Sequence, residues 1–187
     1  MRISRRASLA LAILGLCAPG AHAAESVIGN GIASVCYLHT ERNLNARDGV
    51  RICSDALKND ILSGVDRTAT LINRAIERAR AADTDGAMAD YESAIAIGAN
   101  PGVAYLNRAA TLIALHRYAD ALADADRAVA LKVPRLEIAY YNRGLANESL
   151  GNIEAAYHDF QDALKIAPDF AAATEQLSRF RLVRTDP

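Results

Sequence analysis

The sequence has no tryptophan, only 5% aromatic residues, and no cluster of basic residues interleaved with aromatic ones. A nucleic-acid interface needs concentrated positive charge, whereas this chain carries 21 basic and 22 acidic residues. We therefore expect no nucleic-acid partner. The chain is instead rich in apolar residues, 51% of the total, with many alanines and with charged residues between them. Such sequence is typical of closely packed helices, so we expect an all-α protein.

Long apolar runs are also lacking. The run from Ala7 to Leu16 is about ten residues long, whereas a membrane-spanning helix needs ~20. Three arginines precede it, and a small-x-small site ends at Ala23. This order is typical of a secretory signal peptide, so we predict that residues 1–23 are removed. The mature protein would be periplasmic or secreted, without stable membrane insertion, and would carry 18 basic against 22 acidic residues, because three of the 21 basic residues leave.

Cysteine is scarce, with three residues in all, and Cys17 lies in the predicted signal peptide. Cys36 and Cys53 remain, with sixteen residues between them. Because an exported protein meets an oxidising compartment, we predict a disulfide between these two residues. The alternative is half a metal site at Cys36 and His39, but the second pair of ligands that a structural zinc site needs is missing. We expect no metal and no cofactor.

An Asn-Arg pair returns along the chain at a spacing of 34 and then 35 residues, as Asn73-Arg74, Asn107-Arg108 and Asn142-Arg143. Alignment on this pair gives three units, 68–101, 102–136 and 137–170, each with the pattern of two helices joined by a tight turn. Small residues recur at three places in every unit, where two helices can approach closely. They are Ala75, Ala87 and Ala94, then Ala109, Ala121 and Ala128, then Gly144, Ala156 and Ala163.

The third unit carries the most specific pattern. Its signature positions hold Tyr140, Gly144, Ala156, Phe160, Ala163 and Pro168. In type and spacing these residues resemble the tetratricopeptide repeat, and the resemblance extends over residues 68–170. It implies a right-handed superhelical array of helix-turn-helix hairpins. The sequence departs from the family pattern where Arg replaces the Leu before the Gly, and where Arg78, Leu112 and Asn147 replace a Tyr.

Both flanks fit an array that must be capped at its ends. The segment VRICSDALKN, residues 50–59, aligns with YHDFQDALKI, residues 157–166, so residues 24–67 are expected to form a degenerate N-terminal helical pair that contains the disulfide. Residues 171–187 are expected to form a capping helix and tail, with Leu177 and Phe180 against the preceding hairpin.

An aspartate stands sixteen residues after each repeated arginine. With Arg on the first helix and Asp on the second, we predict an ion pair inside each hairpin. The alternative is a row of arginines presented to an anionic ligand. The predicted pairs are Arg74 with Asp90, Arg108 with Asp124, and Arg143 with Asp159.

The family builds its concave face from the first helix of each hairpin, and the resemblance implies a peptide-binding site there. The amides expected to hold a peptide backbone belong to Asn73, Asn107 and Asn142, and the side chains expected to contact it are Ile72, Leu106, Tyr141 and Leu145. The Lys partners of a carboxylate clamp are replaced by Ile72, Ile76 and Ile138, so we expect no preference for a free acidic C-terminus. The alternative is that the amides brace neighbouring backbone and the face is covered within the protein.

Nothing in the sequence indicates an enzyme. His39, His116 and His158 fall at turn or outer-face positions of the alignment, and no Ser or Cys has an activating context. We expect a non-enzymatic scaffold of the cell envelope that binds an apolar or amphipathic protein or peptide segment. One alternative is a structural or self-assembling protein whose groove is covered by another copy or by its own flanks. Another is a binder of a small molecule or cell-wall fragment, which would need a deep pocket.

Overall fold

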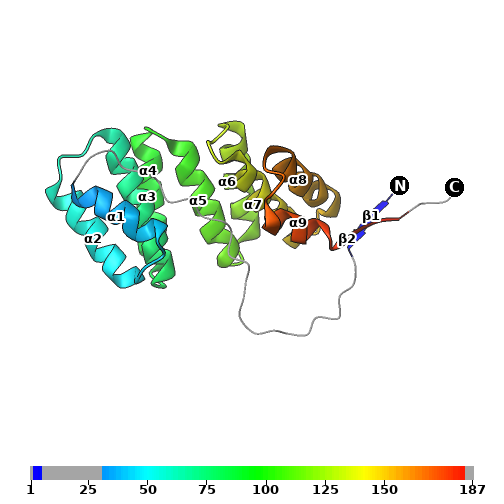
Figure 1. Ribbon diagram of the computed structural model, residues 1–187, viewed down its shortest axis with the longest axis horizontal. Coiled ribbons are helices and arrows are strands. Elements are labelled where there is room, and N and C mark those ends of the chain that lie inside the picture. Colours follow the sequence, from blue (N-terminus) through cyan, green and yellow to red (C-terminus); the bar gives the residue numbers. More distant parts are fainter. Residues whose placement is uncertain (1, 6–30, 184–187) are drawn as a thin grey trace. The chain divides into compact units, whose positions relative to one another are not determined.

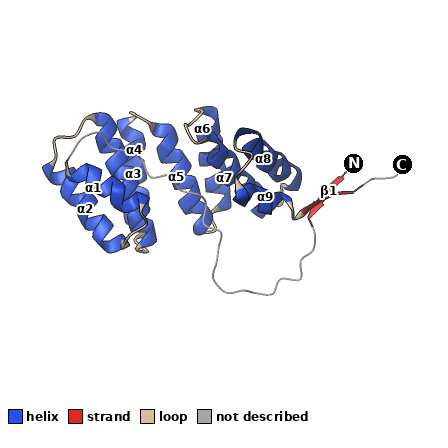
Figure 2. Cartoon of the chain, in the orientation of Figure 1, coloured by secondary structure: helices blue, strands red, loops and turns tan. Residues whose placement is uncertain are grey.

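The computed structural model describes residues 2–5 and 31–183 (Figure 1). Within this part the chain is helical apart from one short pair of strands (Figure 2), which confirms the predicted all-α fold class. The described residues fall into two compact units, one that ends at Arg108 and one that comprises residues 109–183 with residues 2–5. Residues 6–23 of the predicted signal peptide, Cys17 among them, lie outside the described residues.

Side chains placed at the helix starts explain where three helices of the first unit begin. The side chains of Asn45, Ser63 and Asp83 accept backbone N–H groups at the starts of α2, α3 and α4, as N-cap residues do. Gly98 ends α4 with φ 74°, a left-handed conformation that glycine adopts without strain. The helices of this unit are α1 (Ile32–Glu41), α2 (Ala46–Asn59), α3 (Gly64–Arg80), α4 (Thr84–Ile97) and the first part of α5 (Pro101–Ala114).

The core of the first unit lies where α3, α4 and α5 meet. Tyr91 of α4 is fully buried there, together with Ile72 of α3 and Val103 of α5. All nine small residues singled out by the repeat pattern are buried, in this unit and in the second. Their burial is what close helix–helix contact requires, because a larger side chain at these places would hold the backbones apart.

The disulfide joins the two helices of the N-terminal pair. Cys36 of α1 is bonded to Cys53 of α2, with a Cα–Cα distance of 4.9 Å, and both residues are fully buried. The predicted disulfide is therefore present in the structure. The next helix, α3, begins at Gly64, slightly before the expected unit boundary at residue 68.

The second unit continues from the end of α5. Gly144 of α7 allows the closest approach, because a Cβ there would lie 2.7 Å from Cε1 of Phe160 on α8. The further elements are α6 (Tyr118–Ala130), α7 (Leu136–Ser149), α8 (Ile153–Ile166), α9 (Ala171–Leu177), β2 (Phe180–Val183) and β1 (Arg2–Arg5).

In the C-terminal region, where a capping helix and tail were expected over residues 171–187, the helix is short and a strand follows it. Helix α9 ends at Leu177, and residues 180–183 form strand β2, antiparallel to β1, with Ile3 opposite Leu182. The physical reason is visible in the sequence, where Phe180 and Leu182 alternate with arginines at the two-residue period of a strand. Phe180 is buried against α8, with its ring centre 5.7 Å from that of Tyr157.

Candidate functional site

The residues predicted to line a peptide groove lie on the first helices of the hairpins, as expected, but they are buried. Asn73, Asn107 and Asn142 have no exposed surface. Their apolar neighbours Ile72, Leu106, Tyr141 and Leu145 are buried as well. In this structure the face is therefore covered, and peptide binding by these residues stays a prediction. Ile72 shows the physical reason, since its side chain belongs to the core that α3 shares with α4 and α5.

The amide of Asn107 shows what such a buried side chain does. Its Nδ2 donates a hydrogen bond of 3.0 Å to the carbonyl of Val103, one turn earlier on α5. A buried amide has to be hydrogen-bonded, and here a neighbouring backbone group supplies one of its partners. This is the bracing role that the sequence analysis gave as its alternative.

On α7 the chain's own C-terminal flank lies over the same face. The ring of Tyr141 lies 5.1 Å from that of Phe170, and its hydroxyl is hydrogen-bonded to Gln176 of α9. Burial raises the pKa of the Tyr141 hydroxyl above its ordinary value, and the hydrogen bond with Gln176 lowers it in part. Nearby, Glu148 forms an ion pair of 3.0 Å with Arg179. This part of the face is therefore engaged within the second unit itself.

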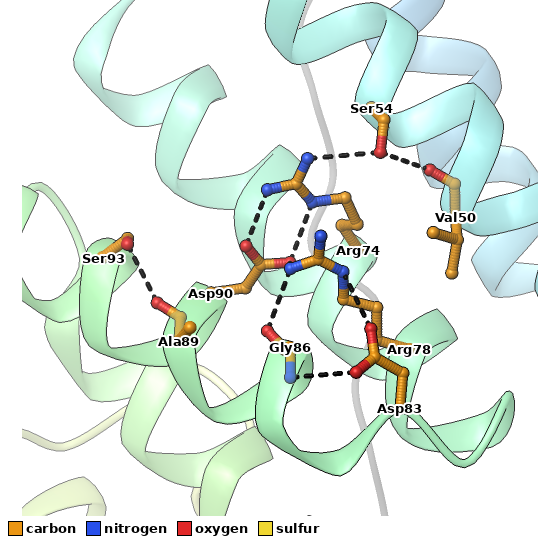
Figure 3. A network of polar contacts seen from close by, with 9 residues as sticks. All are labelled: Val50, Ser54, Arg74, Arg78, Asp83, Gly86, Ala89, Asp90 and Ser93. Atoms are coloured by element: carbon orange, nitrogen blue, oxygen red, sulfur yellow. Dashed lines mark hydrogen bonds and ion pairs between the residues drawn. The ribbon is translucent and has the colours of Figure 1, made fainter.

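A network of polar contacts joins the helices of the first hairpin (Figure 3). The guanidinium of Arg74 binds the Asp90 carboxylate through two bonds, Nη2 to Oδ1 at 2.7 Å and Nε to Oδ2 at 2.8 Å. Arg78, one turn later on α3, brings its Nη1 to 2.9 Å from Oδ2 and donates to the carbonyl of Gly86. Ser54 of α2 accepts a hydrogen bond from Arg74 at 3.2 Å. One buried carboxylate thus holds two arginines of α3.

The third hairpin has a related arrangement, in which both arginine bonds go to one carboxylate oxygen and an asparagine binds the other. Arg143 Nη2 donates to Oδ1 of Asp159 at 2.7 Å, and Asn147 Nδ2 donates to Oδ2 at 2.9 Å. Asn147 occupies the repeat position that Arg78 holds in the first hairpin. Sequence reasoning recorded both residues only as departures from the family's Tyr and missed their role. Their position could have indicated this role, because each is a hydrogen-bond donor one helical turn after the arginine that pairs with the aspartate.

The middle pair of the predicted series, Arg108 with Asp124, has one member in each compact unit, and it stays a prediction. The guanidinium of Arg108 lies 5.6 Å from the ring centre of Tyr105, and that of Arg143 lies 5.2 Å from the ring centre of Tyr140. Each of these arginines therefore stacks over a tyrosine one turn earlier on its own helix, at the distance of a cation–π contact.

His39 lies inside the first unit, so the prediction that it falls at a turn or outer face is wrong. Its Nδ1 is 3.2 Å from Oε1 of Glu77, which has no exposed surface. Arg80 binds the other carboxylate oxygen at 2.7 Å. Gly49 of α2 makes room for this carboxylate, because a Cβ at that position would lie 2.5 Å from Cδ of Glu77. The N-terminal alignment was too weak to place His39 facing α3.

His116 and His158 lie in the second unit. His116 is at a turn, with Nδ1 2.6 Å from the hydroxyl of Tyr118, and His158 is exposed on α8. Within residues 2–5 and 31–183, no group of three or more His, Cys, Asp or Glu residues could hold a metal ion. No helix in that same part of the chain is both long and apolar enough to cross a membrane.

Residues 138–170, which form α7, α8 and the turn after them, match the family model of the tetratricopeptide repeat. The chain is 38% identical over 78 residues to the Hsp70-Hsp90 organizing protein of Triticum aestivum, which is 42% of this chain and 13% of that protein. It is 30% identical over 102 residues to serine/threonine-protein phosphatase 5 of Homo sapiens, 54% of this chain and 20% of that protein. The match therefore spans a small part of each relative.

Solved structures show the same hairpins. The first TPR of Spaghetti, bound to the HSP90 peptide SRMEEVD, is similar with 27% identity and a TM-score of 0.56, over 60% of this chain and 88% of that one. These findings support the tetratricopeptide repeat family. MamA from Desulfovibrio magneticus shares the fold at 19% identity and a TM-score of 0.62, over 79% of this chain and 82% of that one.

Proposed function

We propose that this chain is a non-enzymatic scaffold that binds a protein or peptide segment through its tetratricopeptide-type hairpins. The observation that carries the proposal is the likeness to the Spaghetti structure, which has an HSP90 peptide bound. Fold alone does not fix function, so the partner has to be argued from the residues of the face itself. The stretch shared with phosphatase 5 is a fifth of that protein, and the activity in its name is not carried over to this chain.

The binding surface that we propose is the first-helix face of the unit that ends at Arg108. It comprises Ile72 and Asn73 from α3, and Leu106 and Asn107 from α5. Because these side chains are buried, a ligand reaches them only when the packing over them opens. The apparent affinity would then fall in proportion to the fraction of molecules in the open state. We therefore expect modest affinity for any peptide bound at this face.

The ligand that we propose is an apolar or amphipathic segment with no requirement for a free acidic C-terminus. Ile72, Ile76 and Ile138 stand where a carboxylate clamp needs Lys, and an alkyl side chain gives a carboxylate no charge partner. The asparagine amides remain suitable for a peptide backbone of any sequence, since an amide both donates and accepts.

A titration of the full chain with two forms of one peptide tests this ligand class. The peptide SRMEEVD, to which the Spaghetti domain is bound, is compared with the same peptide amidated at its C-terminus. We expect the peptide with a free C-terminal carboxylate to bind no more tightly than the amidated peptide, as measured by fluorescence anisotropy. A clear preference for the free carboxylate would contradict the proposed ligand class.

We further propose that the protein acts in the periplasm or outside the cell. The order of charged, apolar and small residues over positions 1–23 supports export, and the Cys36–Cys53 disulfide fits an oxidising compartment. Mass spectrometry of the protein from an expressing cell would test this, because we expect the mature chain to begin at Ala24. A protein recovered from the cytoplasm with Met1 intact would contradict it.

A structural or self-assembling role is the second candidate, and one observation favours it. Tyr141 already contacts Phe170 and Gln176 of the chain's own C-terminal flank, so part of the predicted groove is covered from within. The solution mass separates the two candidates. A monomer that binds peptide supports the scaffold, whereas a stable dimer that binds none supports self-assembly.

A further inference from the structure

The second unit contains a strand that is held from one side by a helix. Phe180, the first residue of β2, is buried against α8, with its ring centre 5.7 Å from that of Tyr157 and 6.0 Å from that of Phe160. Aromatic contacts at these distances fix the start of β2 on the helix. The strand therefore has a defined position, which an isolated strand of four residues in water would not have.

The edge of β2 carries an antiparallel strand from a distant part of the sequence. Residues Arg2–Arg5 pair with Phe180–Val183, and Arg2 lies opposite Val183 while Ile3 lies opposite Leu182. No tight turn links these strands, since they come from opposite ends of the chain (Figure 1). In this respect β1 is bound to β2 as a separate extended peptide would be.

Beside the strand pair lies a hollow of about 700 Å³. Ile3 forms one wall of the hollow, and the other walls come from the turn before α8 and from the first part of that helix. Ile3 is half-buried, so part of its apolar surface is removed from water here. The lining residues on the helix side are Gly151, Asn152, Ile153, Glu154, Ala155 and His158.

We propose that β2 and the start of α8 form a strand-accepting site for an extended peptide. The peptide runs antiparallel to β2, places an apolar residue where Ile3 lies, and carries polar residues on either side of it. Backbone hydrogen bonds to the strand edge supply affinity in this mode, and the walls of the hollow beside the apolar residue supply selectivity. In the precursor the site is filled by Arg2–Arg5, and removal of residues 1–23 would open it to a partner.

The charge and polarity of the segment that occupies the site support this class of partner. Arg2-Ile3-Ser4-Arg5 has one apolar residue among polar ones, and Glu154 lies in the wall of the hollow. An exposed strand edge pairs readily with another chain, and a site that also has a hollow beside the strand restricts which chains fit. The site is independent of the first-helix face proposed above, because it uses α8 and β2 only.

A cross-link tests the strand register in the full chain. Ser4 lies opposite Arg181, so Ser4→Cys with Arg181→Cys should form a disulfide in a Cys17→Ser background. Ser4→Cys with Leu182→Cys is the matched control, because neighbouring strand residues point to opposite faces. We expect oxidation of the first pair and little of the second, by mass spectrometry. Equal oxidation of both pairs would overturn the register.

Binding in trans is tested with a labelled peptide of residues 1–8 and the full chain that carries Ile3→Asp. The substitution weakens the chain's own strand, so this variant should bind the peptide at least about tenfold more tightly than the unaltered chain does. The same peptide with Ile3→Asp should lose at least about tenfold in affinity. Circular dichroism confirms that the variant stays folded.

Absence of saturable binding to the folded Ile3→Asp chain would overturn the proposal, and so would equal binding of both peptides. Dimerisation of that variant without peptide binding would also overturn it, because β2 would then accept a second copy. Asn107→Ala should leave this binding unchanged. Failure at β2 is therefore distinguishable from failure of the first-helix face.

Discussion

Arg143 binds Asp159 through Nη2 at 2.7 Å and Nε at 3.0 Å, from neighbouring helices of one hairpin. The carboxylate is almost fully buried, and its second oxygen accepts a hydrogen bond from Asn147. A buried carboxylate is costly unless it is paired and hydrogen-bonded, and this one is both. The arginine that departs from the family pattern is thus explained by the aspartate sixteen residues later.

A double-mutant cycle should show that Arg143 and Asp159 are coupled. Either single change to Ala already removes the contact between the two residues, so the double mutant should lose less stability than the two single losses added together. We expect a coupling energy of about 1–3 kcal/mol in the free energy of unfolding by urea.

The ion pair between Arg117 and Asp120 is the matched control. Its Nη2 and Oδ2 atoms are 2.6 Å apart, but both side chains are more than half exposed. Solvent screening should hold its coupling below about 1 kcal/mol. Additive effects at Arg143 and Asp159 would show that their contact does not stabilise the hairpin.

Gly144 should be the least replaceable glycine of the second unit. A Cβ at this position would lie 2.7 Å from Cε1 of the buried Phe160, so Gly144→Ala should destabilise the fold by about 1–3 kcal/mol. Gly64→Ala is the control, since the nearest atom there is 3.9 Å from the added Cβ. Alanine favours a helix over glycine, so the control should be neutral or slightly stabilising. Equal thermal shifts for both variants would refute the steric argument.

The disulfide should stabilise the N-terminal pair. Replacement of both Cys36 and Cys53 by Ala should cost about 3 kcal/mol in the chain-entropy model, because the bond closes a loop with a sequence separation of 17. Thiol titration of the unfolded, unreduced full chain gives the direct check. We expect one reactive thiol, from Cys17, whereas three would mean that the bond is absent.

Glu77 should be essential to the first unit. It is fully buried, accepts a hydrogen bond from Arg80 Nη1 and contacts His39, so Glu77→Ala removes the carboxylate that these two side chains share. We expect a loss of about 3 kcal/mol in the free energy of unfolding. Glu92→Ala, at an exposed position of α4, should change stability by less than about 0.5 kcal/mol. A Glu77→Ala variant as stable as that control would mean that the buried carboxylate is dispensable.

The sequence predicted the hairpins because their contacts are local and periodic. Close helix packing needs small residues at fixed places, and Ala75, Ala87 and Ala94 are buried as that pattern requires. The spacing of sixteen residues likewise placed Arg74 beside Asp90. Both inferences depend on a repeat that three units display, so an error in one unit is visible in the others.

The parts that sequence reasoning missed depend on contacts between distant residues. His39 lies beside Glu77, but the repeat pattern of the N-terminal helical pair is too degenerate to predict which side of α1 contacts α3. Strand β2 has four residues and pairs with a strand that begins at Arg2, so its alternating pattern did not by itself identify it as a strand. The burial of Asn107 was missed for a different reason, since helical spacing shows which residues share a face but does not show what covers that face.

Hydrogen exchange of the backbone amides, with and without a bound peptide, tests most directly the proposal that the first-helix face binds a peptide. The peptide is selected from a random display library against the immobilised full chain, and exchange is then followed with and without it. We predict an apolar or amphipathic peptide that adds protection within residues 69–79 and 103–108. Unchanged exchange in these segments at saturating peptide would contradict the account, and protection confined to residues 151–158 and 180–183 would place peptide binding at β2 instead.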